Sequence, residues 1–209
     1  MIPCAPMKKS SFPVYLAGDL VFRPNALALF ERLKGLCAEE GLEGIAPFDG
    51  QADARALPPG RETILAFVRA ARTLMDDCAG ALICIDPFRR SADMDPGTAV
   101  EIGYLLGIGK PMEGYTTDGR SYREKVGSYW RDAWNGSLSL RPSCDAPSSG
   151  AEEDPDGMLV HSDGLMQNGM IEGFIGFSGG TVAVDNNFEI AFHHAARRLA
   201  RRLQERSLA

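Results

Sequence analysis

The chain has 209 residues, of which 44% are hydrophobic and 24% are charged, so it is long enough to bury the core of one globular domain. Its formal net charge of −6 disfavours a nucleic-acid partner, because binding to a phosphate backbone needs a basic surface. The sequence has neither the apolar core of a signal peptide near its start nor a run of roughly 20 apolar residues for a membrane helix. We therefore expect no membrane partner and a cytoplasmic location.

Short apolar runs alternate with longer amphipathic segments along the first half of the chain. The pattern predicts strands at 13–18, 44–48, 80–86 and 111–115, and helices at 25–40, 61–77 and 98–108. The run at 80–86 is apolar without alternation, which is typical of a parallel strand covered on both faces. This order predicts an α/β fold, with a doubly wound, flavodoxin- or Rossmann-like parallel sheet of about five strands flanked by helices.

The second half of the chain changes in composition. Residues 134–156 are rich in Ser, Pro, Gly, Asp and Glu, and we expect a loop insertion there. Asp185, Asn186 and Asn187 offer caps for a C-terminal helix within 185–206. Residues 1–209 are expected to form a single domain.

Polar side chains gather where the predicted strands end. In a doubly wound sheet these carboxyl ends meet at one edge, which is where ligands bind. The segments expected there are 18–19, 49–51, 86–101 and 115–118. The richest of them contains Asp95, placed as a helix cap before Pro96, and Glu101, about one and a half turns further along the helix.

Carboxylates are the main reactive groups that this pattern offers. No metal site is expected, because His193 and His194 are adjacent and point to different faces of a helix. Neither a GxSxG motif nor a phosphate-binding glycine loop is present. A carboxylate pair can run glycosyl transfer, with one group as nucleophile and the other handling the proton. On spacing alone, a solvated Glu101 and a plain helix cap at Asp95 remain the alternative.

Several segments, in this order, resemble the nucleoside 2-deoxyribosyltransferase family over roughly residues 13 to 175. The stretch 14–22 resembles the family's first strand and loop, and 49–51 resembles its base-recognition turn. Residues 95–103 (DPGTAVEIG) match the family signature. Residues 163–171 (DGLMQNGMI) resemble a late loop that often reaches into the site of a neighbouring subunit.

The resemblance implies roles for individual residues. Glu101 matches the nucleophile that forms a glycosyl-enzyme ester, and Tyr15 matches the tyrosine that holds this carboxylate. Asp95 matches a residue that binds the 5′-hydroxyl of the sugar, and it is also a candidate for proton delivery to the base. Ala71 stands where the family usually has Asp or Asn facing the base. The substrate contacts implied in addition are Phe22, Asp49, Gln51, Asn168 and Met170.

The expected activity is transfer of a 2-deoxyribosyl group between nucleobases, without a cofactor, in a homo-oligomer with shared sites. The expected partners are a small-molecule nucleoside and a nucleobase. One alternative is a hydrolytic N-glycosidase that acts on nucleosides or nucleoside 5′-monophosphates, although a carboxylate at Asp95 would repel a phosphate. A second alternative is a non-catalytic nucleotide-binding module, which the joint presence of Tyr15, Asp95, Glu101 and Asn168 disfavours.

Overall fold

The computed structural model describes residues 11–51, 57–141, 151–161 and 163–208. Its centre is a five-stranded sheet in the order β2-β1-β3-β4-β8, and all neighbouring strands are parallel. The strands are β1 (Phe12–Ala17), β2 (Leu42–Ile45), β3 (Gly80–Cys84), β4 (Met112–Thr116) and β8 (Val182–Val184). The predicted α/β architecture is confirmed, and β8 is a strand that the sequence pattern did not predict.

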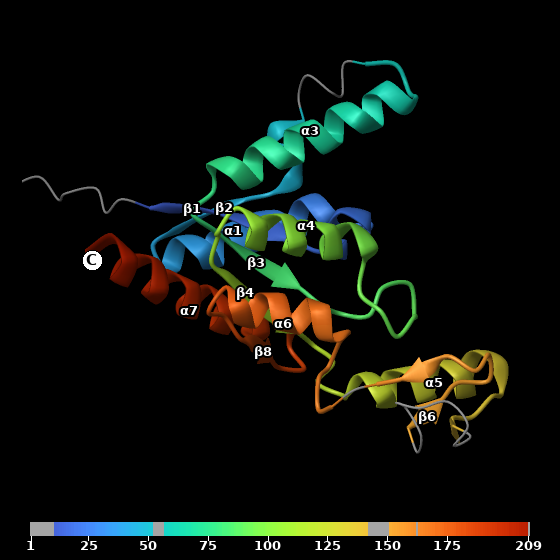
Figure 1. Cartoon of the computed structure of the whole chain (residues 1–209). Coiled ribbons are helices and arrows are strands. Elements are labelled where there is room, and N and C mark those ends of the chain that lie inside the picture. The colour runs from blue at the N-terminus through green and yellow to red at the C-terminus, as the bar shows by residue number, and fades with distance from the viewer. Residues whose placement is uncertain (1–10, 52–56, 142–150, 162, 209) are drawn as a thin grey trace, which may run out of the picture.

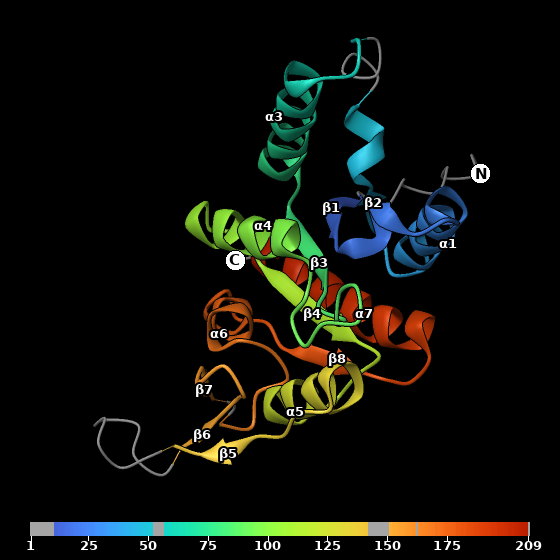
Figure 2. The same cartoon turned by 90° about the vertical axis from the view of Figure 1, so that its right-hand side faces the viewer.

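Helices cover both faces of this sheet (Figures 1 and 2). One face packs against α1 (Ala26–Glu39) and α7 (Phe188–Leu208). The other face packs against α3 (Arg61–Asp77), α4 (Pro96–Gly107) and α6 (Gly169–Phe177). Two short 3-10 helices, η1 (Asp19–Phe22) and η2 (Pro47–Gly50), follow β1 and β2 at the carboxyl edge of the sheet.

Strand alternation in β1 decides which side chains face the helices α3 and α4. Val14 and Leu16 are buried in the cluster formed with α1 and α7. Tyr15 and Ala17 are buried in the opposite cluster, together with residues of α3, α4 and α6. Because successive residues of a strand point to opposite faces, the apolar pattern of β1 fixes the phenol of Tyr15 on the α4 side.

A small extension follows β4. It consists of α5 (Tyr122–Trp134) and a three-stranded antiparallel sheet of β5 (Ser139–Leu140), β6 (Glu152–Glu153) and β7 (Leu159–Val160). The expectation of a loop at 134–156 was therefore wrong for β5 and β6, while residues 142–150 of that segment lie outside the described residues. Strands of two residues leave no alternating pattern, so composition alone indicated a loop.

The predicted C-terminal helix is present as α7, which begins at Phe188 and ends at Leu208. Asn187 caps it, since its side-chain oxygen accepts hydrogen bonds from the backbone N–H groups of Glu189 (3.0 Å) and Ile190 (3.2 Å). Within the described ranges, every helix is too short or too polar to span a membrane.

Candidate active site

The centre of the candidate site is a hydrogen bond between β1 and α4. The hydroxyl of Tyr15 donates to Oε1 of Glu101 at 2.8 Å, across 86 residues of sequence. Tyr15 is fully buried, and Glu101 lies in the second turn of α4. The structure thus brings together the two residues for which the resemblance implied a nucleophile and its holder.

Burial changes the protonation of this pair. Desolvation raises the pKa of Glu101 to about 7, the hydrogen bond from Tyr15 opposes this rise, and the negative charge of Asp95 adds to it. The pKa of Tyr15 is raised by burial and by the neighbouring Glu101 carboxylate, so the phenol remains a donor at neutral pH. A carboxylate whose pKa lies near neutrality is a typical candidate for a catalytic group.

Asp95 begins the helix that carries Glu101. Its Oδ2 accepts hydrogen bonds from the backbone N–H of Thr98 (2.8 Å) and from the hydroxyl of Thr98 (2.9 Å), which makes it the N-cap of α4. Pro96 fills the first helical position, where a missing N–H costs nothing. The side chain of Asp95 is buried, and its charge acts on the Glu101 carboxyl group. Asp95 is therefore a helix cap, and its position also brings its carboxylate close enough to Glu101 for the two groups to interact electrostatically.

Two aromatic rings meet near the carboxyl edge of the sheet. Phe22, in η1, is mostly exposed, and its ring centroid lies 5.4 Å from that of Phe88. The guanidinium of Arg89 sits over the other ring of the pair, 4.9 Å from the Phe88 centroid. An exposed ring such as that of Phe22 can stack on a planar base, and the partly buried Phe88 supports it from one side. The sequence pattern placed the segment 86–101 at this edge without singling out Phe88, whose contact with Phe22 appears only in the folded chain.

Asp49 and Gln51 have local roles in the turn after β2. Oδ2 of Asp49 accepts from the backbone N–H of Ala46 (2.8 Å), and its Oδ1 accepts from Nζ of Lys34 (2.9 Å). The N–H of Gln51 donates to the carbonyl of Phe48 (3.3 Å). Among the described hydrogen bonds, none joins Asp49 or Gln51 to the Tyr15–Glu101 pair, so their substrate contacts stay predictions.

The late loop ends where α6 begins. Asn168 is the N-cap of α6, and its side-chain oxygen accepts from the N–H of Met170 at 3.0 Å. Met170 itself is exposed. Asn168 also lines a hollow of about 450 Å³, which lies between the N-terminal ends of α4 and α6 and which Phe88, Met94 and Pro96 share. The structure thus brings Asn168 to the start of the helix that carries Glu101.

The position expected to face the base on α3 carries Ala71, which is partly buried and has no titratable group. No group of three or more His, Cys, Asp or Glu side chains in the described part of the chain is arranged to hold a metal ion. The reactive groups that the site brings together are therefore the carboxylates of Glu101 and Asp95 and the phenol of Tyr15.

Comparison with known proteins identifies the family. The model of the nucleoside 2-deoxyribosyltransferase family matches residues 14–170, a range that includes Tyr15, Asp95, Glu101 and Asn168. The chain belongs to the nucleoside 2-deoxyribosyltransferase family. An uncharacterized protein of Schizosaccharomyces pombe is 55% identical over 190 residues, which cover 91% of this chain and 89% of that protein.

Two solved structures share the fold of this family member. A 2-deoxyribosyltransferase from Leishmania mexicana has a TM-score of 0.58 at 23% identity, with 88% of this chain and 97% of that chain covered. A conserved protein from Enterococcus faecalis V583 has a TM-score of 0.52 at 16% identity, with 94% and 99% covered. At these identities the likeness shows the arrangement of strands and helices.

The raised pKa of Glu101 predicts that this residue costs stability above neutral pH. The folded carboxyl group holds its proton up to a pH of about 7, whereas an unfolded one loses it near 4.3. Stability is thus lost as the pH rises through this window, by up to about 4 kcal/mol. Glu101→Gln keeps the acceptor for Tyr15 but cannot ionise. Urea unfolding should find this variant more stable than wild type at pH 8, by a margin that shrinks towards pH 4.5.

An exposed carboxylate provides the control. Glu205 lies on the surface of α7, and Glu205→Gln should differ from wild type by the same small amount at both pH values. If the free energy of unfolding of Glu101→Gln differs from that of wild type by the same amount at pH 4.5 and pH 8, the raised pKa of Glu101 is contradicted.

Proposed function

We propose that this protein transfers a 2-deoxyribosyl group between nucleobases by double displacement, with Glu101 as the nucleophile. The observation that carries the proposal is the desolvated Glu101 carboxyl group held by the buried hydroxyl of Tyr15. Burial leaves the ionised carboxylate poorly solvated, and the hydrogen bond fixes one of its oxygens. The other oxygen is then directed to the anomeric carbon of the sugar.

The reaction has two displacement steps. In the first, an oxygen of Glu101 bonds to C1′ while the C1′–N bond breaks, and the electron pair leaves with the base. The departing base takes up a proton, which we assign to a relay from solvent water through Asp95, because the described side-chain bonds of Asp95 use Oδ2 and leave Oδ1 open. In the second step a nitrogen of the acceptor base bonds to C1′, the N–H proton of that base passes back through Asp95 to water, the ester bond breaks, and the Glu101 carboxylate is restored. Two inversions give net retention at C1′.

Hydrolysis is the nearest alternative, since water can replace the acceptor base in the second step. Nucleoside 5′-monophosphates are less suitable substrates, because Asp95 is expected beside the 5′ position of the sugar. Two unit negative charges about 4 Å apart repel each other by about 4 kcal/mol at an effective dielectric constant of 20. Transfer therefore depends on a free nucleoside and on a site that excludes water.

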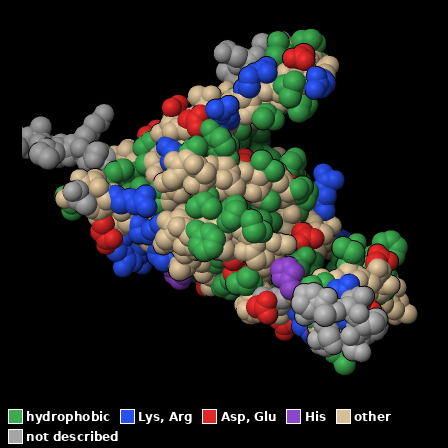
Figure 3. Space-filling view, in the orientation of Figure 1, with side chains coloured by type: hydrophobic (Ala, Val, Ile, Leu, Met, Phe, Trp, Pro, Cys, Tyr) green, Lys and Arg blue, Asp and Glu red, His purple; other side chains and the backbone are tan. Residues whose placement is uncertain are grey.

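A second copy of the chain would supply that exclusion. Hydrophobic side chains gather over α4 and α6 in Figure 3, and Val100, Met170 and Phe177 are 73%, 60% and 80% exposed. Exposed apolar side chains that lie close together often mark a contact between chains. We therefore propose a homo-oligomer in which Asn168 and Met170 complete the site of a neighbouring copy, in keeping with the resemblance of the late loop. Its location in the cytoplasm remains a prediction.

Incubation with 2′-deoxynucleosides, with and without a free acceptor base, tests the activity directly. Chromatography should show a new deoxynucleoside when the acceptor is present and slower release of base without it, with lower kcat/KM for the matching 5′-monophosphates. Glu101→Gln should lose more than about 100-fold in turnover while it keeps the wild-type circular dichroism spectrum, because a covalent nucleophile is lost. Release of base that is unaffected by an acceptor would indicate a hydrolase, and inactivity on all these substrates would favour a binding module.

Subunit mixing tests the shared site. Glu101→Ala and Asn168→Ala proteins should each be inactive, yet a re-associated mixture should regain activity, because some sites then combine wild-type Glu101 from one copy with wild-type Asn168 from the other. The measurement is transfer activity after mixing, with subunit exchange followed by native mass spectrometry. Full activity in a monomer, or no recovery despite proven exchange, contradicts the shared site.

A further inference from the structure

Gln167 is a buried polar residue of the late loop, next to Asn168, and only 1% of its surface is exposed. Its Nε2 donates to the backbone carbonyls of Ile85 (3.1 Å) and Ala92 (3.3 Å). Two carbonyl acceptors require an NH₂ group, so these bonds define which end of the amide faces them. Gln167 thus ties the late loop to both the end of β3 and the loop that precedes α4.

The backbone on the Gln167 side of this connection is held firmly. Oε1 of Glu172 accepts from the N–H groups of Met166 (2.5 Å) and Gln167 (2.7 Å). The ammonium group of the buried Lys125, on α5, donates to the carbonyl of Met166 at 2.8 Å. Burial lowers the pKa of Lys125. These bonds fix the backbone of the late loop at Met166 and Gln167, so the position of the Gln167 amide is fixed as well.

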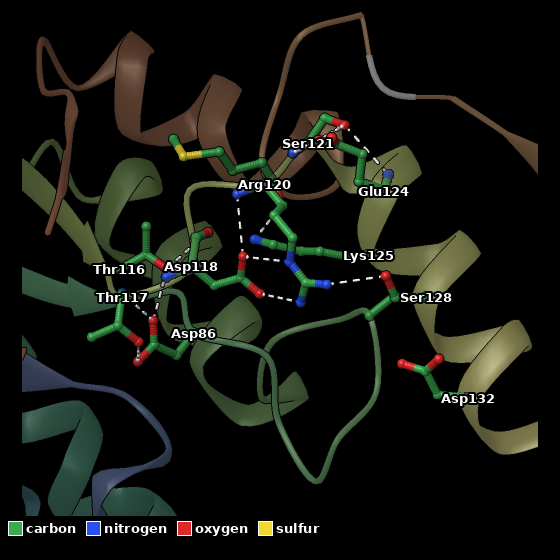
Figure 4. Close-up of polar contacts among 12 residues, drawn as sticks. Asp86, Thr116, Thr117, Asp118, Arg120, Ser121, Glu124, Lys125, Ser128 and Asp132 are labelled. Carbon is green, nitrogen blue, oxygen red and sulfur yellow. Dashed lines mark hydrogen bonds and ion pairs between the residues drawn. The ribbon is translucent and has the colours of Figure 1, made fainter. Parts of the chain in front are cut away.

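The support itself is anchored to the carboxyl edge of the sheet. Figure 4 shows Lys125 reaching towards the ion pair of Asp118 and Arg120, which follows β4. Arg120 donates to both oxygens of Asp118 (2.9 and 2.6 Å) and also to the hydroxyl of Ser128 on α5 (3.0 Å). The bond to Ser128 joins the segment after β4 to the middle of α5, the helix that carries Lys125.

The segment that Gln167 holds has an unfavourable local conformation. Arg89 and Arg90 have φ angles of 53° and 63°, in the left-handed region that residues with a side chain adopt uncommonly and at a cost in free energy. The same segment carries Phe88 and leads directly into Asp95, the cap of the nucleophile helix. Local bonds close the loop, since the N–H of Phe88 donates to the carbonyl of Asp93 (2.8 Å) and the hydroxyl of Ser91 donates to the carbonyl of Phe88 (2.7 Å). The Gln167 amide fastens the closed loop to the rest of the site.

We propose that Gln167 is a positioning residue for deoxyribosyl transfer, and that its two amide hydrogen bonds hold Asp95 and Phe88 in register with Asn168. The proposal rests on the proposed function. Gln167 acts through these residues without touching the substrate. Because one side chain joins the loop before α4 to the residue before Asn168, it sets the spacing between the two groups expected around the 5′ end of the sugar.

Loss of this connection has a specific kinetic signature. A displaced Asp95 and Phe88 no longer align the sugar and base with Glu101, so kcat falls by roughly 10- to 100-fold, the range expected for small misplacements. Water that enters beside the loosened loop better solvates the Glu101 carboxylate, which faces Tyr15 and Asp95. The acid limb of the kcat/KM profile, expected near pH 7 in wild type, then moves to lower pH.

The test compares Gln167→Met, which keeps the length and apolar stem but has no amide, with Gln204→Met on the exposed surface of α7. For each protein, kcat, KM and the pH profile are measured at a temperature where urea unfolding shows that it is folded. Hydrogen exchange of the amides 88–95 is recorded in parallel. Gln167→Met should show lower kcat, a shifted acid limb and faster exchange, while Gln204→Met should match wild type in all three.

A folded Gln167→Met protein with wild-type kcat and acid limb would overturn the positioning role. A lower kcat with an unshifted acid limb and unchanged exchange at 88–95 would also overturn it, because the loop would then be in place. An inactive wild-type protein is a failure of the proposed function itself. The activity of the wild-type protein therefore tests the proposed function separately. If the wild-type protein is inactive, hydrogen exchange still tests the role of Gln167, and unchanged exchange of the amides 88–95 in Gln167→Met would refute it.

Discussion

The hydrogen bond from Tyr15 to Glu101 is the constraint on which the rest of the site depends. It joins a fully buried strand residue to a helix residue far away in sequence, so it forms only when β1 and α4 are packed together. The face of β1 that carries Tyr15 follows from strand alternation. The rotational position of Glu101 follows from where α4 begins, which Asp95 and Pro96 determine. Two local signals therefore combine to place one tertiary contact.

The same contact has a cost, because the carboxyl group of the partly buried Glu101 loses part of its contact with water. The carboxyl edge of the sheet is otherwise rich in paired polar groups, such as Asp86, which accepts from Thr116 (2.7 Å) and from the N–H of Thr117 (2.6 Å). Among the described residues, Glu101 has one such partner, Tyr15, and Asp95 adds a like charge nearby. A carboxylate that is poorly solvated and close to a like charge is suited to bond formation with an electron-poor carbon. Its ionised form also makes the site less stable than a filled apolar core would be.

Much of this arrangement could be predicted from the sequence. Apolar runs located four of the five strands, the Asp-Pro-Gly stretch located the start of α4, and the family resemblance paired Tyr15 with Glu101. β8 was missed because three residues give no usable pattern. α6 was missed because Gly169, Gly173 and Gly176 lower its helix propensity, so that tertiary packing decides the conformation.

Other features could not be read from a one-dimensional pattern. The sequence does contain a signal for α5, namely the capping box formed by Ser121 and Glu124. The pattern of apolar residues alone did not predict this helix. Asp49 was expected to contact the base, but its pairing with Lys34 depends on how α1 packs beside β2. The role of Gln167 depends on two carbonyls 75 or more residues away, and no periodicity or motif indicates such a contact.

The most direct test of the central claim is to trap the covalent intermediate. The protein is mixed with a 2′-deoxynucleoside without acceptor base, quenched rapidly in acid, digested and analysed by mass spectrometry. The account predicts one added deoxyribosyl group on Glu101 itself, lost when an acceptor base is supplied before the quench and absent from Glu101→Gln. An adduct on another residue, or turnover with inverted configuration at C1′ and no adduct, would contradict the assignment of Glu101 as the nucleophile.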